Sequence, residues 1–202
     1  MQATAIIEAL SRSVGESARF AAVESRDGMP TIDVPREHLV ETGIALRDAP
    51  ELRFVFLADI VPVDYYPREP RFELSYILVC PGVAGYGDAP KRLRLKVRVP
   101  DGATVPSVSG VWASANWAER EAFDLYGLFF DGHPDLRRIL MPEDWEGYPM
   151  RKDYPVQIKQ PVKTYEPLQV TEEEFVANVE EARRASQGSA RPEPASGRAR
   201  QD

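Results

Sequence analysis

The chain has few of the residues that most metal and redox sites require. Its 202 residues include a single cysteine, Cys80, and two histidines, His38 and His133. One cysteine excludes an internal disulfide and a four-cysteine zinc or iron–sulfur site built by this chain alone. We therefore expect the chain to carry no metal and no redox cofactor of its own.

Long apolar runs and an excess of positive charge are also missing. No stretch approaches the roughly 18–20 apolar residues that a membrane-spanning helix needs. The first residues, with an acidic group at Glu8, lack the basic and apolar regions of a signal peptide. The net charge of −7 disfavours nucleic acid and anionic lipid as main partners. We expect a protein on the cytosolic side, free or against a membrane.

The first two thirds of the chain predict an α+β fold. A strand is predicted at residues 91–99, because residues 92–99 alternate strictly between basic and aliphatic side chains, which is typical of a strand with one buried and one solvated face. The four bases of this alternation are more consistent with a solvated or ion-paired face than with nucleic-acid binding. Short connections favour a mostly antiparallel sheet with flanking helices. The other predicted elements are helices at 2–19 and from Pro35, and strands at 20–23, 32–34, 54–63 and 72–79.

The character of the sequence changes at Pro134, after which prolines recur every six to eight residues as far as Pro167. This spacing excludes a helix of ordinary length, yet the stretch is rich in aromatic residues that must be buried on something. We predict an α+β domain at 1–133 and an extended arm at 134–170 that wraps its own domain or a partner. A short helix follows at 171–185, opened by a capping box of Thr171 and Glu174. Residues 186–202 have the composition of a disordered tail.

A helix predicted over Trp117–Tyr126 carries most of the functional information. Asn116 is a suitable N-cap with Glu119 in the capping-box position, and Gly127 is a suitable stop. Helical spacing places Arg120, Glu121 and Asp124 on one side together with Trp117, on which Arg120 can stack. Glu119 falls on the opposite, apolar side, where a carboxylate needs a partner. A helix with two such sides indicates packing between two bodies.

An enzymatic alternative would make Glu119, Glu121 and Asp124 acid–base groups acting with His133. We disfavour it because no nucleophile or cleft motif accompanies these residues, and we predict no catalytic residue. His133 lacks companion ligands for a metal and is better explained as a hydrogen-bonded structural residue. The neighbouring Arg151 and Asp153 suit ion pairing, at an interface or within a loop.

This segment resembles the signature of a known family. Residues Glu119–Tyr126 are followed after six residues by His133, then by Arg137 and by Ile139–Leu140. The pattern, together with residues 115–117 and 149–155, is similar to that of the 30-kilodalton-type subunit of respiratory complex I. In bacteria this is the C-type subunit of NADH:quinone oxidoreductase. The resemblance covers about residues 35–160, and Phe56–Ile60 and Asp64 resemble the family's central strand region.

The resemblance implies a cofactor-free structural subunit in the peripheral arm of a proton-pumping NADH:quinone oxidoreductase. FMN and iron–sulfur clusters are then expected in partner subunits. The implied partners are the D-type subunit, which is related to the large subunit of nickel–iron hydrogenases, and the iron–sulfur subunits known as B and I. The implied location is the cytoplasmic side of the inner membrane, with only indirect membrane contact.

The resemblance also implies which residues form the subunit interface or support it. Alternatives are an equivalent subunit of a membrane-bound hydrogenase, a formate hydrogenlyase or a plastid-type quinone reductase, or a stand-alone protein-binding module. The expected interface residues are Glu119, Arg120, Glu121, Asp124, His133, Arg137, Arg151, Lys152, Asp153 and Tyr154.

Overall fold

The computed structural model describes residues 2–15, 18–82, 89–156 and 171–188. They belong to two units, of which the first ends at Val156 and the second contains a single described helix, α4 (Glu172–Gly188). None of the described helices is both long and apolar enough to cross a membrane.

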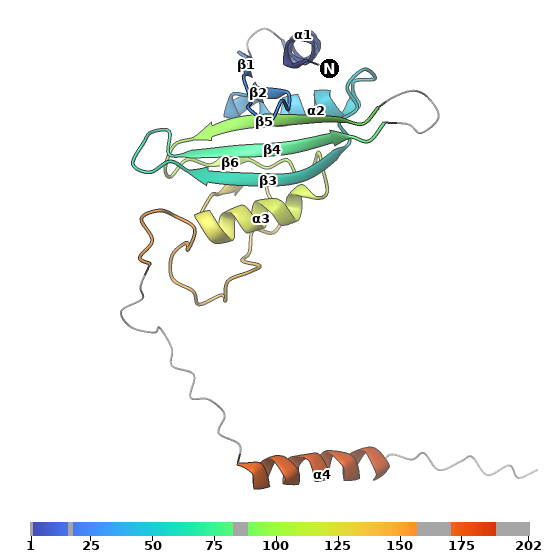
Figure 1. Ribbon diagram of the computed structural model, residues 1–202, viewed down its shortest axis with the longest axis vertical. Coiled ribbons are helices and arrows are strands. Elements are labelled where there is room, and N and C mark those ends of the chain that lie inside the picture. Colours follow the sequence, from blue (N-terminus) through green and yellow to red (C-terminus); the bar gives the residue numbers. More distant parts are fainter. Residues whose placement is uncertain (1, 16–17, 83–88, 157–170, 189–202) are drawn as a thin grey trace, which may run out of the picture. The chain divides into compact units, whose positions relative to one another are not determined.

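The first unit is built on a five-stranded sheet with the strand order β1-β2-β5-β4-β3 (Figure 1). The pairs β1–β2, β5–β4 and β4–β3 are antiparallel, whereas β2 and β5 run parallel. The predicted α+β class and the mostly antiparallel sheet are therefore confirmed, with one parallel pair. The strands are β1 (Ala21–Val23), β2 (Thr31–Asp33), β3 (Phe56–Asp64), β4 (Phe72–Cys80) and β5 (Lys91–Val99).

Strand β5 has the predicted two faces. Its four aliphatic side chains from Leu93 to Val99 are fully buried. Three of its bases are ion-paired on the other face, where Arg94 binds Asp27, Lys96 binds Glu73 and Arg98 binds Asp33. The basic face is therefore an ion-paired sheet surface.

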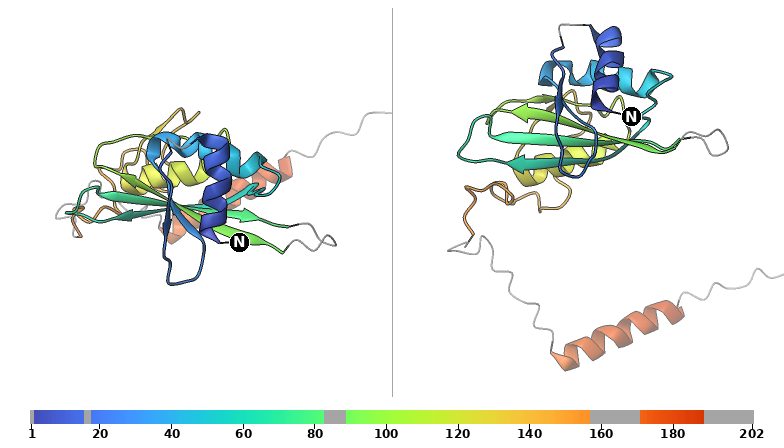
Figure 2. Two further views of the ribbon diagram at one scale, coloured as in Figure 1. Left: turned by 90° about the horizontal axis from the view of Figure 1, so that it is seen from above. Right: turned by 45° about the horizontal axis from the view of Figure 1, so that its top comes forward.

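Helices close the apolar face of the sheet. Helix α1 (Ala3–Val14) packs on α2 (Leu39–Asp48), and α3 (Ala115–Tyr126) lies along β3 (Figures 1 and 2). The predicted helix at 2–19 is too long, because the chain leaves helical geometry at Gly15, which has φ 99°. Pro35 precedes a single 3-10 turn (Arg36–His38) that leads into α2.

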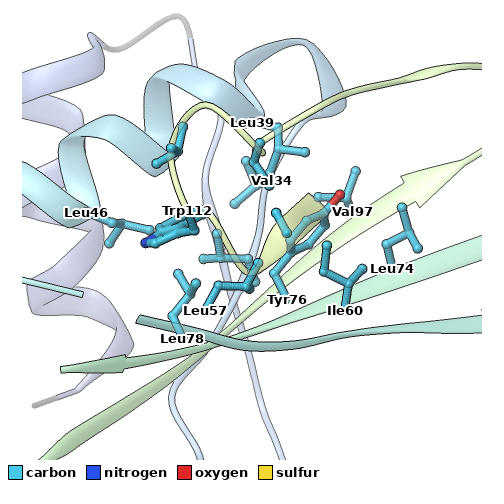
Figure 3. Close-up of a cluster of buried hydrophobic side chains, with 14 of the residues drawn as sticks. Val34, Leu39, Leu46, Leu57, Ile60, Leu74, Tyr76, Leu78, Val97 and Trp112 are labelled. Atoms are coloured by element: carbon cyan, nitrogen blue, oxygen red, sulfur yellow. The ribbon is translucent and has the colours of Figure 1, made fainter. Parts of the chain in front are cut away.

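The core lies between α2, the loop before α3 and the inner face of the sheet (Figure 3). Trp112 fills this space and donates its indole N–H to the carbonyl oxygen of Phe54 at 2.9 Å. Leu46 of α2 and Leu57, Tyr76 and Leu78 of the sheet are fully buried in the same cluster. Trp112 thus fixes the loop that introduces α3.

Two very short strands were not predicted. β6 (Val105–Pro106) pairs in parallel with β7 (Phe130–Asp131). Two residues are too few to show an alternating pattern, so the sequence carries no signal for them. The pair brings the chain before α3 beside the chain after it.

The first unit extends further than the predicted domain. Residues 134–156 belong to it, so the predicted boundary at 133/134 is replaced by one after Val156. The rest of the predicted arm, 157–170, lies outside the described residues. Helix α4 begins with the predicted capping box, in which Thr171 and Glu174 exchange hydrogen bonds of 3.1 and 3.3 Å. It runs to Gly188 rather than ending at 185, and the remainder of the predicted tail is outside the described residues.

The hydroxyl of Tyr76 generates a prediction about stability. It is fully buried and has no hydrogen-bond partner among the described residues. A buried polar group without a partner costs about 1–3 kcal/mol. Tyr76→Phe should therefore raise the free energy of unfolding by about 1 kcal/mol or more, measured by urea denaturation. A destabilised variant would show that the hydroxyl has a partner.

Candidate functional site

Helix α3 is the centre of the predicted signature. It begins at Ala115, one residue before the predicted N-cap Asn116, and no side chain caps it. The hydroxyl of Ser114 instead donates to the carbonyl oxygen of Leu57 at 2.8 Å, which ties the helix start to β3. The helix ends as predicted at Gly127, whose φ of 70° is readily adopted only by glycine.

Glu119 lies on the apolar side of α3, as predicted, and is fully buried. It does not form the predicted capping box. Its carboxylate accepts hydrogen bonds from the Ser107 hydroxyl at 2.6 Å and the Val108 backbone N–H at 2.7 Å. Burial raises the pKa of Glu119 to about 7, although these two hydrogen bonds act in the opposite direction. Glu119 therefore joins α3 to the loop that follows β6.

His133 is held beside Glu119 by hydrogen bonds to the backbone. Its Nδ1 accepts the Asp135 N–H at 3.0 Å, which assigns the ring proton to Nε2 and a donated bond to the Asn116 carbonyl at 3.1 Å. The Nε2 atom is 4.0 Å from the Glu119 carboxylate. These contacts are those of a structural histidine.

Helical spacing placed Asp124 on one side of α3 with Trp117, Arg120 and Glu121, and it did not predict whether Asp124 is exposed. In the structure Asp124 is fully buried. The reason is that residues 134–156, the covering segment, fold back over this side of α3. One carboxylate oxygen of Asp124 accepts three consecutive backbone N–H groups, from residues 139, 140 and 141, at 3.0, 2.7 and 2.8 Å.

Arg138 completes the environment of Asp124 and was not among the predicted site residues. Its guanidinium donates to the Asp124 carboxylate at 2.7 Å and to the carbonyl oxygens of Trp145 and Gly147 at 3.1 and 3.0 Å. Burial alone would raise the pKa of Asp124, but the backbone N–H groups and Arg138 outweigh it and hold that pKa below its usual value. Charge and hydrogen bonds therefore fix the covering segment onto α3.

Arg120 fixes the same segment from the outer side. It donates to the carbonyl oxygens of Arg137 and Arg138 at 3.0 and 3.2 Å, and its guanidinium stacks on Trp117 as predicted. Arg137 itself is exposed and pairs with Asp135 at 2.7 Å. Glu121 is exposed, and no ion pair is seen for it among the described residues.

The end of the covering segment is held by a further charged cluster around Arg71, which was not among the predicted site residues, although its partner Asp153 was. Arg71 is almost fully buried and forms a bidentate pair with Asp64 at 2.9 and 3.1 Å. It also binds Asp153 at 2.6 Å and Asp101 at 2.9 Å. Burial opposes ionisation of Asp64, but Arg71 and two backbone N–H groups lower its pKa to about 2.

The other predicted residues of this segment contact the chain itself. Arg151 donates to the carbonyl oxygen of Tyr126 at 2.5 Å, and its guanidinium lies over the rings of Phe72 and Tyr148. The backbone N–H of Lys152 binds Asp64 at 2.9 Å, while the residue remains exposed. The Tyr154 hydroxyl donates to the Glu146 carbonyl at 3.3 Å.

The predicted residues are therefore divided among three clusters, around Glu119, around Asp124 and around Arg71. All three are used to fold this chain. Among the described residues, no three His, Cys, Asp or Glu side chains are arranged to hold a metal ion. Five large apolar side chains of α3 and the described segment after it, as far as residue 156, remain more than half exposed: Trp117, Phe129, Leu140, Met150 and Val156.

These clusters lie within a region that matches a family model. Residues 32–160 match the model described as the 30 Kd subunit of respiratory-chain NADH dehydrogenase. The chain belongs to this family. The Glu119, Asp124 and Arg71 clusters are thus parts of the family's shared domain, and the resemblance noted in the sequence is confirmed.

Curated relatives agree with the family model. The second C-type subunit of the NADH-quinone oxidoreductase of Rhizobium etli is 49% identical over 131 residues, which are 64% of this chain and 66% of that relative. The C-type subunit of the NADH-quinone oxidoreductase of Chlorobium phaeobacteroides is 42% identical over 158 residues, covering 77% of this chain and 90% of that relative. The chain spans about two thirds of the first relative's length.

A solved structure shares the fold. A chain of the membrane-bound sulfane sulfur reductase, an archaeal respiratory membrane complex, aligns with a TM-score of 0.59 and 23% identity. The alignment covers 76% of this chain and 85% of that chain. At this identity the likeness shows that the two chains share a fold.

The Asp124 cluster yields a prediction for this member of the 30 Kd family. In Asp124→Asn, Arg138 loses its buried counter-charge. The side-chain NH2 group of the asparagine is in addition a hydrogen-bond donor that faces other donors. Removing one partner of a buried pair costs about 3–5 kcal/mol. We expect a loss of about 3 kcal/mol in urea denaturation. The control, exposed Glu121→Gln on the same helix, should change stability by less than about 0.5 kcal/mol; equal effects would contradict the assigned role.

A second prediction concerns the packing of the covering segment against Gly127. A Cβ at Gly127 would overlap the ring of Tyr148, whereas one at Gly28, which has the same φ of 70°, would meet nothing within 4 Å. Gly28→Ala should cost about 1–2 kcal/mol from the backbone alone. Gly127→Ala should cost about 1–3 kcal/mol more because Tyr148 must move. Equal losses in chemical denaturation would show that Tyr148 does not pack there.

Proposed function

We propose that this chain is the structural C-type subunit of a NADH-quinone oxidoreductase and takes no part in the chemistry itself. Its role is to hold the quinone-reducing module of the complex together. The family model over residues 32–160 and the names of its curated relatives support this assignment.

The observation that carries the proposal is how the charged signature residues are used. An acid–base mechanism needs groups that are free to exchange protons with a substrate. Asp124 instead receives four hydrogen bonds from the covering segment, and His133 is engaged through both ring nitrogens. Such residues are suited to building a rigid surface rather than to binding a substrate.

The surface so built has the chemistry of a protein interface. Trp117, Leu140 and Met150 expose 64%, 60% and 53% of their area, and Arg120 lies over the Trp117 ring. Exposed tryptophan beside arginine is typical of residues that dominate binding energy between proteins. We therefore assign the partner-facing side to α3 and the covering segment.

The proposal extends to partners, cofactors and location. The neighbours are the D-type subunit, related to the large subunit of nickel–iron hydrogenases, and the iron–sulfur subunits known as B and I. FMN and the iron–sulfur clusters reside in partner subunits, and this chain binds none. The complex places the chain on the cytoplasmic side of the inner membrane, in contact with the membrane only through other subunits.

Assembly of the complex tests the proposal. Trp117→Ala and Leu140→Ala, each introduced in a tagged full chain, should reduce the amount of complex recovered from mildly solubilised membranes. Turnover of NADH with quinone per assembled complex should stay near that of the wild type. Ile44→Ala, an apolar residue of α2 that is 43% exposed, serves as the control and should leave recovery unchanged.

Other outcomes would contradict the proposal. Normal recovery with lost turnover would indicate a catalytic role. Purification with a hydrogenase-like or formate hydrogenlyase-like assembly, without NADH activity, would favour those complexes. Recovery of the chain alone would favour an independent binding module.

A further inference from the structure

The buried carboxyl of Glu119 is connected to the surface by two serine hydroxyls. Ser107 lies 2.6 Å from the Glu119 carboxylate, and the Ser109 hydroxyl lies 2.8 Å from that of Ser107. Glu119 is fully buried, whereas both serines are partly exposed. Three oxygen atoms at hydrogen-bonding distance thus lead from the core to solvent.

The hydrogen bonds between these side chains can point in either direction, because each serine hydroxyl can both donate and accept. When Glu119 is ionised, Ser109 donates to Ser107, and Ser107 donates to the carboxylate. When Glu119 is protonated, its O–H donates to Ser107, and Ser107 donates to Ser109. The Val108 N–H donates a hydrogen bond of 2.7 Å to the other carboxyl oxygen in both states.

We propose that Glu119 is a proton-binding site that exchanges its proton with solvent through Ser107 and Ser109. A proton arriving from water at Ser109 displaces the hydrogen of Ser109 onto Ser107, and that of Ser107 onto Glu119. One proton enters and none leaves, so the net change is neutralisation of one buried negative charge. The ligand of this site is the proton alone.

The groups around Glu119 leave its charge uncompensated. The segment after β7 presents His133, whose Nε2–H is directed to the Asn116 carbonyl instead. Strand β4 presents the Tyr76 hydroxyl, which has no hydrogen-bond partner among the described residues. Its pKa is raised mainly by burial and to a smaller extent by the charge of Glu119. The loop after β6 presents only the neutral donors of Ser107 and Val108. No cation therefore holds the carboxyl in its ionised form among these contacts.

The link that Glu119 makes between α3 and the loop after β6 therefore depends on pH. The pKa of Glu119 rises from 4.5 to about 7 on folding, so the folded chain holds the proton more tightly than the unfolded chain does. The contribution of this proton to the free energy of unfolding is complete below pH 4.5 and is lost as the pH rises through 7. The folding equilibrium constant should fall on the order of a hundred-fold across this range.

The test compares the full wild-type chain with Glu119→Gln, which reproduces the hydrogen bonds of the protonated carboxyl. Urea denaturation from pH 5 to 8 should show a loss of stability in the wild type and a nearly flat profile in the variant. The exposed Glu121→Gln should keep the wild-type profile. An unchanged profile in Glu119→Gln would overturn the proposal.

Two further measurements separate Glu119 from His133 and do not depend on the glutamine variant folding. Ser107→Ala removes a donor to the carboxylate, so the midpoint of the stability change should move to higher pH. Infrared difference spectra between pH 5 and 8 should show a protonated carboxyl at pH 5 that is absent from Glu119→Gln. An unshifted midpoint in Ser107→Ala, or a carboxyl that is ionised at pH 5, would refute the proposal.

Discussion

The carboxylate of Asp124 receives three successive backbone N–H groups and a guanidinium, and much of the first unit depends on this contact. These hydrogen bonds hold residues 139–141 against α3 and so determine the path of the covering segment. Arg138, held by Asp124, then binds two carbonyl oxygens farther along the same segment. A proline-rich stretch that cannot form its own backbone ladder is ordered by side-chain charge instead.

The Arg71 cluster closes the same segment at its far end. Three aspartates from separate parts of the chain converge on one nearly buried guanidinium. Buried charges are costly unless each is paired and hydrogen-bonded, and here each is. The sheet and α3 thus act as a rigid base, and the covering segment adds an outer layer that presents apolar side chains to a partner in the proposed assembly.

Elements with local signals could be predicted from the sequence. The alternation within Lys91–Val99 predicted β5 to the residue, Gly127 predicted the end of α3, and helical spacing predicted the burial of Glu119. The burial of Asp124 could not be predicted in this way, because its cover comes from residues 15 to 17 positions later, in a stretch without periodicity. Arg71 was missed for the same reason: its aspartates lie 7, 30 and 82 positions away.

The central claim is that the charges of this chain fold the covering segment without help from a partner. Hydrogen–deuterium exchange on the isolated full chain tests it most directly, at the amides of Ile139, Leu140 and Met141. We expect these three N–H groups to be protected in the chain alone, because each is bound to Asp124. Rapid exchange in the isolated chain, with protection only in the assembled complex, would show that the partner orders this segment and would contradict the account.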